Sequence, residues 1–210
     1  MILNGHINGL KKGTVLLERY IDTGYVAIDS VRIYGDSNFE LQQTIESPEI
    51  LHLYLRLENG TLLDDRVSFF AEPGEISLYT KLEDFSNPNI EGSKNHDLLM
   101  TYSKIAERYK DRNLDLIAEG INALRDGNDS LAAVIENKKK TLTSNSYLAT
   151  VNFALQNSDY EVAPFIMMYI TPDINVRYLD TVYNNLSDKA KNSIYGQQLE
   201  TRIAEIKEEN

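Results

Sequence analysis

The stretch RVSFFAEPGEISLY, residues 66–79, decides which fold class this chain is expected to adopt. It reads as a strand, a tight turn at Pro73-Gly74 and a second strand, which is the signature of a β-hairpin. Pro73 fixes φ near the value that a turn needs, and Gly74 accepts the positive φ that follows. The side chains predicted to share the inner face are Val67, Phe69 and Ala71 before the turn, and Ile76, Leu78 and Thr80 after it.

The region before and around this stretch consists of short alternating segments separated by turn residues such as Asn8-Gly9 and Asn59-Gly60. The predicted strands are residues 2–7, 14–20, 25–33, 39–41, 50–57, 67–71, 76–80 and 89–91. About eight short strands with β-branched and aromatic enrichment predict two antiparallel sheets packed face to face, a β-sandwich.

The hydrophobic period changes to about 3.6 residues after Gly92-Ser93, which predicts a helix. Ser93 or Asn95 is expected to cap this helix, and Asp97 suits the positive end of its dipole. Its apolar stripe is predicted to run through Leu98, Tyr102, Ile105, Tyr109, Leu114, Ile117, Ile121 and Leu124, and to stop at residues 126–128.

Further helices are expected after this stop. Their predicted limits are Asp129 or Ser130, a candidate break at the polar run 143–146, the capping-box pattern 158–161 followed by Pro164, the stop at 171–173, and Ser187. The sequence therefore predicts an α+β protein: an antiparallel β-sandwich in residues 1–92, followed by a helical region in residues 93–210 that packs on the sandwich.

Composition excludes several classes of function. The 32 acidic residues against 21 basic ones give a net charge of -11, which disfavours nucleic acid as a partner. The only basic run, residues 138–140, is interpreted as a solvated helix face. The absence of cysteine excludes a redox dithiol, a thiolate zinc site and a disulfide framework within this chain.

Targeting signals give no decision on the compartment. No apolar run reaches the roughly 18 residues of a membrane span, and the first residues show no signal-peptide pattern. The expectation is therefore either a cytosolic protein or one whose targeting segment is missing from this sequence.

The histidines do not form a metal-binding pattern. His6, His52 and His96 each lack a second ligand at metal spacing, so structural or surface roles are expected. Asp64 and Asp65 are adjacent, so on a strand they would point to opposite faces and could not act as an acid/base pair.

Other site patterns also fail. Asp111, Asn113 and Asp115 have the spacing at the start of a calcium loop, but Leu116 and Asn122 stand where such a loop needs Gly and Glu. No serine-nucleophile elbow and no Gly-rich phosphate loop occurs. We therefore predict a protein that is not an enzyme, with no catalytic residues, metal or cofactor.

Two weaker patterns concern carbohydrates. The 13 tyrosines could stack on glycans, but most, including Tyr102, Tyr109 and Tyr183, lie at core-facing spacing and are predicted to be buried. Three short patterns of Asp, a hydroxyl residue and an apolar residue match those on which exported proteins of some bacteria carry O-glycans. Their candidate sites are Ser30, Ser130 and Thr181.

Several short motifs together resemble a known family. They are NGHINGL at residues 4–10, GTVLL at 13–17, IDS at 28–30, FFAEPG at 69–74, IEGSKN at 90–95 and SIYGQQL at 193–199. The chain resembles the uncharacterised β-sandwich domain, with its helical linker, that precedes the thioredoxin domain in TlpA-like thiol-disulfide interchange lipoproteins of Bacteroides-type bacteria. It departs from the family pattern at Ser37-Asn38, where a glycine-containing turn usually leads directly into the next strand.

The resemblance implies a location but no activity. It implies export to the cell envelope, with membrane attachment only through a lipid anchor that this chain does not contain. The thioredoxin domain and its Cys-x-x-Cys are absent, so no redox residue carries over. The first hypothesis is a non-enzymatic envelope module that binds a protein or another envelope component. The alternative is an accessory region of a thiol-disulfide oxidoreductase whose catalytic domain lies outside this chain.

Overall fold

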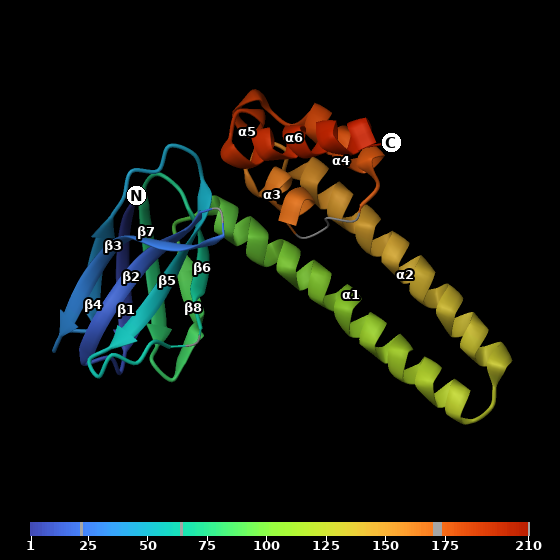
Figure 1. Ribbon diagram of the computed structural model, residues 1–210, viewed down its shortest axis with the longest axis horizontal. Helices are drawn as coiled ribbons and strands as arrows, with labels where there is room; N and C mark the ends of the chain where they lie inside the picture. Colours follow the sequence, from blue (N-terminus) through green and yellow to red (C-terminus); the bar gives the residue numbers. More distant parts are fainter. Residues whose placement is uncertain (22, 64, 170–173, 210) are drawn as a thin grey trace. The chain divides into compact units, whose positions relative to one another are not determined.

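The computed structural model describes residues 1–21, 23–63, 65–169 and 174–209. Within these residues, eight strands in two sheets are followed by six helices, which confirms the predicted α+β class (Figure 1). The chain divides into two compact units, Met1–Asp97 and Leu98–Asn210. The predicted packing of the helical region on the sandwich stays a prediction.

The first unit is the β-sandwich. Its strands are β1 (Ile2–Asn8), β2 (Lys12–Ile21), β3 (Gly24–Tyr34), β4 (Asn38–Gln42), β5 (Glu49–Leu57), β6 (Val67–Ala71), β7 (Glu75–Lys81) and β8 (Asp84–Glu91). The first sheet has the order β4-β1-β7-β8, and the second has the order β3-β2-β5-β6. One cluster of buried side chains from both sheets fills the space between them, with Phe69 fully buried and Leu3 and Leu53 beside it in the cluster.

Residues 66–79 do not form the predicted hairpin. β6 pairs with β5 in the second sheet, whereas β7 pairs with β1 and β8 in the first. The turn at Pro73-Gly74, where Gly74 has a φ of 123°, instead carries the chain from one sheet to the other. The prediction was wrong because a hairpin and a sheet-to-sheet crossing put the same alternate residues, such as Phe69 and Leu78, into the core.

Two other pairings differ from the sequence-based expectation. β1 and β7 run parallel, because they are distant in sequence and no short turn forces them to be antiparallel. The true hairpin is β7–β8, with Lys81 opposite Asp84, and β8 is longer than the predicted segment 89–91. Pro88 weakens the strand pattern there, yet it is tolerated because β8 lies at the edge of its sheet.

The first helix, α1 (Lys94–Arg125), begins in the first unit and continues through the second. Ser93 caps it, since its Oγ accepts a hydrogen bond from the His96 backbone N–H at 3.1 Å, and Asp97 lies in its first turn. The predicted apolar stripe is correct at Tyr102, which is buried. Further along α1 it is wrong, because other side chains face the neighbouring helix.

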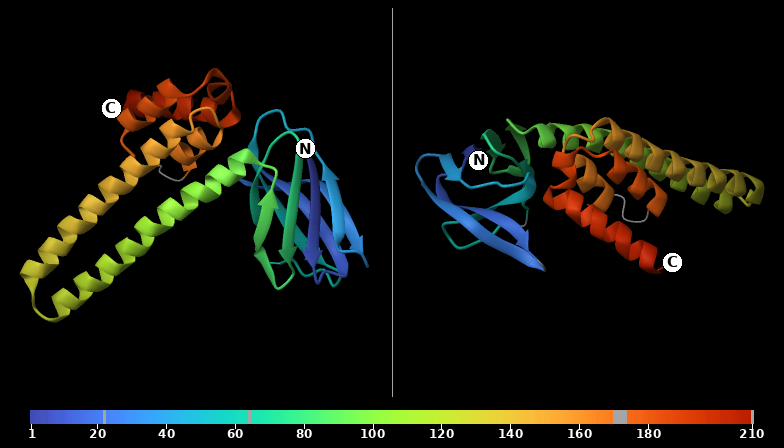
Figure 2. Two further views of the ribbon diagram at one scale, coloured as in Figure 1. Left: turned by 180° about the vertical axis from the view of Figure 1, so that it is seen from behind. Right: turned by 90° about the horizontal axis from the view of Figure 1, so that it is seen from above.

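The second unit contains the remaining helices. They are α2 (Asp129–Gln156), α3 (Val162–Tyr169), α4 (Val176–Asn185), α5 (Asp188–Lys191) and α6 (Ile194–Glu209). α1 and α2 form a long antiparallel hairpin, and α3 to α6 pack around the end of α2 that holds its buried residues 150–154 (Figure 2). None of the described helices is both long and apolar enough to cross a membrane.

The helix limits correct two further predictions. α2 is not interrupted at residues 143–146, because the Thr143 and Ser144 hydroxyls donate to carbonyls four residues back without breaking the helix. Its cap is Asn128, just before the predicted start. Pro164 does not kink α3, since it lies in the first turn, where a missing N–H costs no helical bond. The predicted stop at 171–173 lies outside the described residues.

Candidate functional site

The outer face of the first sheet carries a row of polar and aromatic side chains across all four strands. Asn38 of β4 is opposite His6 of β1, His6 is opposite Tyr79 of β7, and Tyr79 is opposite Asn89 of β8. We call these four residues the cross-strand row. A second line in register beside it consists of Glu40, Asn4, Ser77 and Glu91.

The two lines of side chains surround an open hollow of about 460 Å³. The His6 ring accepts or donates at Nδ1 to Asn38 Oδ1 over 2.8 Å, and it stacks on the Tyr79 ring with centroids 5.3 Å apart and planes 7° apart. Asn89 donates from Nδ2 to Glu91 Oε1 at 3.0 Å. These contacts hold the side chains upright beside one another on the sheet.

Local sequence positions this face through the core beneath it. Leu3, Gly5 and Ile7 alternate inward from β1, so Asn4 and His6 point outward. A Cβ added to Gly5 would lie 1.9 Å from the Phe39 ring, so this ring occupies the place of a side chain at Gly5. The pairing of Gly5 with Phe39 fixes the register that puts His6 opposite Asn38. Asn38 is one of the two residues at which the chain departs from the family pattern.

Several polar groups of the hollow are available to a ligand. In the described part of the chain, no hydrogen bond is recorded for the side chains of Asn4 and Ser77 or for the Tyr79 hydroxyl, and Tyr79 is 47% exposed. An amide offers two donor hydrogens and an acceptor oxygen, and a tyrosine adds an apolar ring face to its hydroxyl. The face can therefore hydrogen-bond hydroxyl or amide groups while the ring contacts C–H groups.

The outer face of the second sheet holds a different cluster, centred on Arg66. Its guanidinium lies between the Tyr25 and Tyr54 rings, 4.1 and 4.0 Å from their centroids, and its Nε donates to Glu18 Oε2 at 2.9 Å. The hydrogen bond to Glu18 raises the pKa of Arg66. Burial, and then the charge of Arg66, lower the pKa of His52, whose Nδ1 is 2.9 Å from Ser68 Oγ.

The members of this Arg66 cluster satisfy one another, so it stabilises the sheet rather than offering free groups. The cation–π contacts and the ion pair occupy the guanidinium, and Glu18 is 7% exposed. A second ion pair on the same sheet, Arg19 to Glu49, is bidentate, with distances of 2.8 and 2.7 Å. The hollow on the first sheet is therefore the stronger candidate site.

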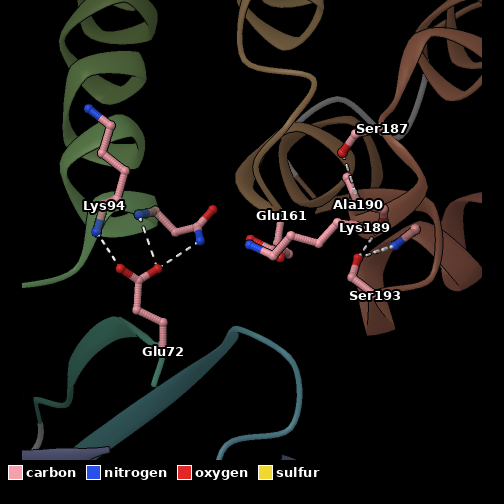
Figure 3. Close-up of polar contacts among 9 residues, drawn as sticks. Glu72, Lys94, Glu161, Ser187, Lys189, Ala190 and Ser193 are labelled. Atoms are coloured by element: carbon pink, nitrogen blue, oxygen red, sulfur yellow. Dashed lines mark hydrogen bonds and ion pairs between the residues drawn. The ribbon is translucent and has the colours of Figure 1, made fainter. Parts of the chain in front are cut away.

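Glu72 ties the sandwich to the start of α1 within the first unit. Its carboxylate accepts hydrogen bonds from the Lys94 backbone N–H at 2.5 Å and from Asn95 Nδ2 at 2.8 Å (Figure 3). A carboxylate at a helix N-terminus pairs with unsatisfied N–H groups and with the positive end of the helix dipole. The motifs FFAEPG and IEGSKN, far apart in sequence, thus meet at this contact.

The motif SIYGQQL has a comparable structural role in the second unit. Ser193 Oγ accepts from the Gly196 N–H at 3.1 Å and donates to the Ala190 carbonyl at 2.6 Å, so it caps α6 and joins it to α5. Figure 3 shows this contact beside the ion pair of Lys189 with Glu161, 3.0 Å long, whose carboxylate is 1% exposed. These contacts order the helices and offer no catalytic arrangement.

The structure separates most residues that the sequence singled out. His52 belongs to the Arg66 cluster, and His96 lies buried in the first turn of α1. Asp111, Asn113 and Asp115 lie on a continuous helix, which rules out a calcium loop. Asp64 lies outside the described residues, so the predicted arrangement of the Asp64-Asp65 pair is not tested.

Two predictions about exposed residues have different outcomes. Tyr102 is buried, but Tyr109 and Tyr183 are only half-buried. Four other tyrosines on the sheets, Tyr20, Tyr25, Tyr34 and Tyr79, are between 44% and 76% exposed, which corrects the expectation of a largely buried set. The candidate O-glycan acceptors Ser30, Ser130 and Thr181 are all exposed, and their modification stays a prediction.

Sequence reasoning missed the cross-strand row. Each member is a polar or aromatic residue at an outward position of an alternating strand, which is an ordinary surface pattern. Only the pairing of β1 with both β4 and β7 brings Asn38, His6 and Tyr79 together. Among the described residues, no group of three His, Cys, Asp or Glu side chains is arranged to hold a metal ion.

Comparison with known proteins identifies one region. Residues 1–99 match a family model described as a domain of unknown function (DUF4369). The match covers the whole sandwich and the first turn of α1 with its Glu72 contact. No curated protein and no solved structure matches the chain. The association with thioredoxin-containing lipoproteins stays a prediction.

Proposed function

We propose that the chain is a non-enzymatic binding module of the cell envelope, and that the cross-strand row on the first sheet is its binding face. The observation that carries this proposal is the in-register line Asn38, His6, Tyr79 and Asn89 beside the hollow. Concave surfaces with a few convergent polar groups are the usual sites of ligand binding.

The chemistry of the face favours a neutral ligand rich in hydroxyl groups, such as an oligosaccharide. Glu40 and Glu91 flank the hollow, and the chain carries a net charge of -11, so an anionic ligand would be repelled. Asn4, Ser77 and the Tyr79 hydroxyl supply donors and acceptors, and the Tyr79 ring supplies an apolar contact. A repeating polymer would match a row that extends across four strands.

The absence of an assigned reaction follows from how the polar groups are used. His6 is engaged with the Asn38 amide rather than with a nucleophile, and Glu91 is engaged with the Asn89 amide. Neither pair is a nucleophile with an adjacent base. The cell-envelope location rests on the sequence resemblance, and fractionation of cells that express the complete gene product would test it.

An NMR titration with soluble neutral oligosaccharides tests the binding face. We expect backbone amide shifts at the cross-strand row with a panel of β-linked and α-linked glucose and N-acetylglucosamine oligomers. Tyr79→Ala and Asn89→Ala should abolish these shifts. Tyr34→Ala is the matched control, because Tyr34 is 76% exposed but lies on β3 in the second sheet.

Two results would count against the proposal. Shifts that appear on the second sheet or the helices, and that survive Tyr79→Ala, would move the binding face elsewhere. An unchanged spectrum with every oligomer of the panel would exclude neutral glycans as the ligand class of this face.

A further inference from the structure

The hairpin formed by α1 and α2 uses only one face of α1. Leu116 and Ala123 of α1 pack with Ile135 of α2, and they are 2%, 3% and 3% exposed. Gly120 lies between them, and a Cβ added to it would meet the Ile135 side chain at 3.5 Å, so the two helices can approach closely there. The remaining faces of this part of α1 lie outside the contact.

A second apolar face of α1 is left uncovered beside this contact. It consists of Leu114, Ile117, Ile121 and Leu124, which are 54%, 38%, 61% and 62% exposed. Their spacing of three, four and three residues is that of a and d positions in a coiled coil. Four large apolar side chains aligned on one exposed helix face mark an interaction surface rather than an ordinary solvated helix.

We propose that this face of α1 binds the same face of a second copy of the chain, with the two helices antiparallel. In an antiparallel pair, a positions of one helix pack against d positions of the other. Leu114 then lies opposite Leu124 of the second copy, and Ile117 lies opposite Ile121. Because the spacing reads the same from both ends, a two-fold axis near residue 119 matches every apolar residue with another. The proposal is independent of the ligand face on the sandwich.

Charge at the edges of this face selects the antiparallel direction. Asp111 and Arg125 lie on its flank away from α2, seven residues on either side of Ala118, which is itself small and exposed. In the antiparallel pair, Asp111 of each copy meets Arg125 of the other. A parallel pair would instead bring Asp111 to Asp111 and Arg125 to Arg125, which is repulsive.

Both charged groups are free to make this contact. Arg125 is 3.8 Å from its neighbour Asp126, and the two side chains are 72% and 69% exposed, so this existing pair is weak. In the described residues, no ion pair is recorded for Asp111. Arg112, the next residue, is already engaged with Asp115 and Glu119.

The size of the contact predicts its strength. Residues 111–125 span about 21 Å of helix, and one helix pair of this length buries less than the roughly 1,200–2,000 Å² of a stable interface. The dimer should therefore be weak and depend on concentration. Within the second unit, the hairpin tip at residues 126–128 projects away from α3 to α6, which leaves the face accessible (Figure 2).

The chain offers a matched control on the other side of the same hairpin. Val134 of α2 is 48% exposed and lines a groove with Arg112, Leu116, Lys138 and Thr141, which includes no member of the proposed face. Ile121→Glu and Val134→Glu therefore place the same charge at exposed apolar positions of neighbouring helices. Neither should unfold the protein, and circular dichroism would verify this.

Sedimentation equilibrium of the 210-residue chain between about 10 and about 500 µM tests the dimer. The mass should rise from 23.9 kDa toward twice that value with increasing concentration. Ile121→Glu should raise the dissociation constant at least about tenfold, which corresponds to the loss of one buried apolar contact, and Val134→Glu should leave it unchanged. A chain that stays monomeric throughout, or equal effects of the two variants, would overturn the proposal.

Charge exchange and cross-linking test the direction of the pair. Arg125→Asp should weaken the dimer, and the double variant Asp111→Arg, Arg125→Asp should restore it. Because the chain has no cysteine, single introduced thiols report proximity cleanly. A mixture of Leu114→Cys and Leu124→Cys chains should form mixed disulfide dimers, whereas Leu114→Cys alone should not. Efficient cross-linking of Leu114→Cys with itself would indicate a parallel pair and refute the antiparallel one.

Discussion

Replacing Glu72 by Ala should loosen the connection between the sandwich and α1. The Glu72 carboxylate accepts from the Lys94 N–H at 2.5 Å, from Asn95 Nδ2 at 2.8 Å and, more weakly, from the Asn95 N–H at 3.4 Å. Removing it leaves the first N–H groups of a 32-residue helix without this acceptor. Ser93 still caps the His96 N–H, so the helix should start later or fray rather than unfold.

The magnitude follows from the contacts. Hydrogen bonds to a charged acceptor contribute about 1.5–3 kcal/mol, and a carboxylate at a helix N-terminus adds about 0.3–1 kcal/mol. Glu72 is half-buried, so water replaces part of what is lost. We expect Glu72→Ala to lower the free energy of unfolding by about 2 kcal/mol, and Glu72→Gln, which keeps an acceptor oxygen but no charge, by about 1 kcal/mol.

Urea unfolding followed by circular dichroism measures the loss, and amide hydrogen exchange at Lys94 and Asn95 localises it. Glu75→Ala is the matched control, because Glu75 is an exposed glutamate three residues further along the chain. The reasoning would be refuted if Glu72→Ala lay within about 0.3 kcal/mol of this control, or if exchange at the first turn of α1 did not accelerate.

Three further predictions concern the core, the helical unit and pH. Phe69→Ala should cost about 3–5 kcal/mol in urea unfolding, because Phe69 is fully buried between the sheets, and a loss below about 1 kcal/mol would contradict this. Gly196→Ala should destabilise the protein in thermal melts, because its Cβ would lie 2.1 Å from the Ala190 carbonyl oxygen. The control Gly120→Ala, whose Cβ meets Ile135 only at 3.5 Å, should be neutral or stabilising by up to about 1 kcal/mol. Burial lowers the pKa of His96, so the unfolded chain binds this proton more tightly; stability should therefore be complete above pH 6.5 and fall as the pH drops toward the folded pKa, and His96→Gln should flatten this dependence in urea melts at stepped pH.

The local pattern of the sequence was sufficient for the fold class. Alternation in residues 1–92 and the 3.6-residue period after Ser93 each depend on neighbours along the chain, so they predict strands, helices and their order. The Ser93 cap and Asp97 in the first turn of α1 were predicted for the same reason. Position in the chain also explains the inward alternation of Val67 and Phe69, which is correct in both possible topologies.

Tertiary structure decided what lies beside what. The crossing at Pro73-Gly74, the parallel pairing of β1 with β7 and the exposed face of α1 all depend on which element packs against which, and alternation is blind to that choice. The cross-strand row exists only because that topology aligns Asn38, His6 and Tyr79 from strands far apart in the sequence. A polar residue on one strand is ordinary, and it becomes part of a site when the sheet supplies its neighbours.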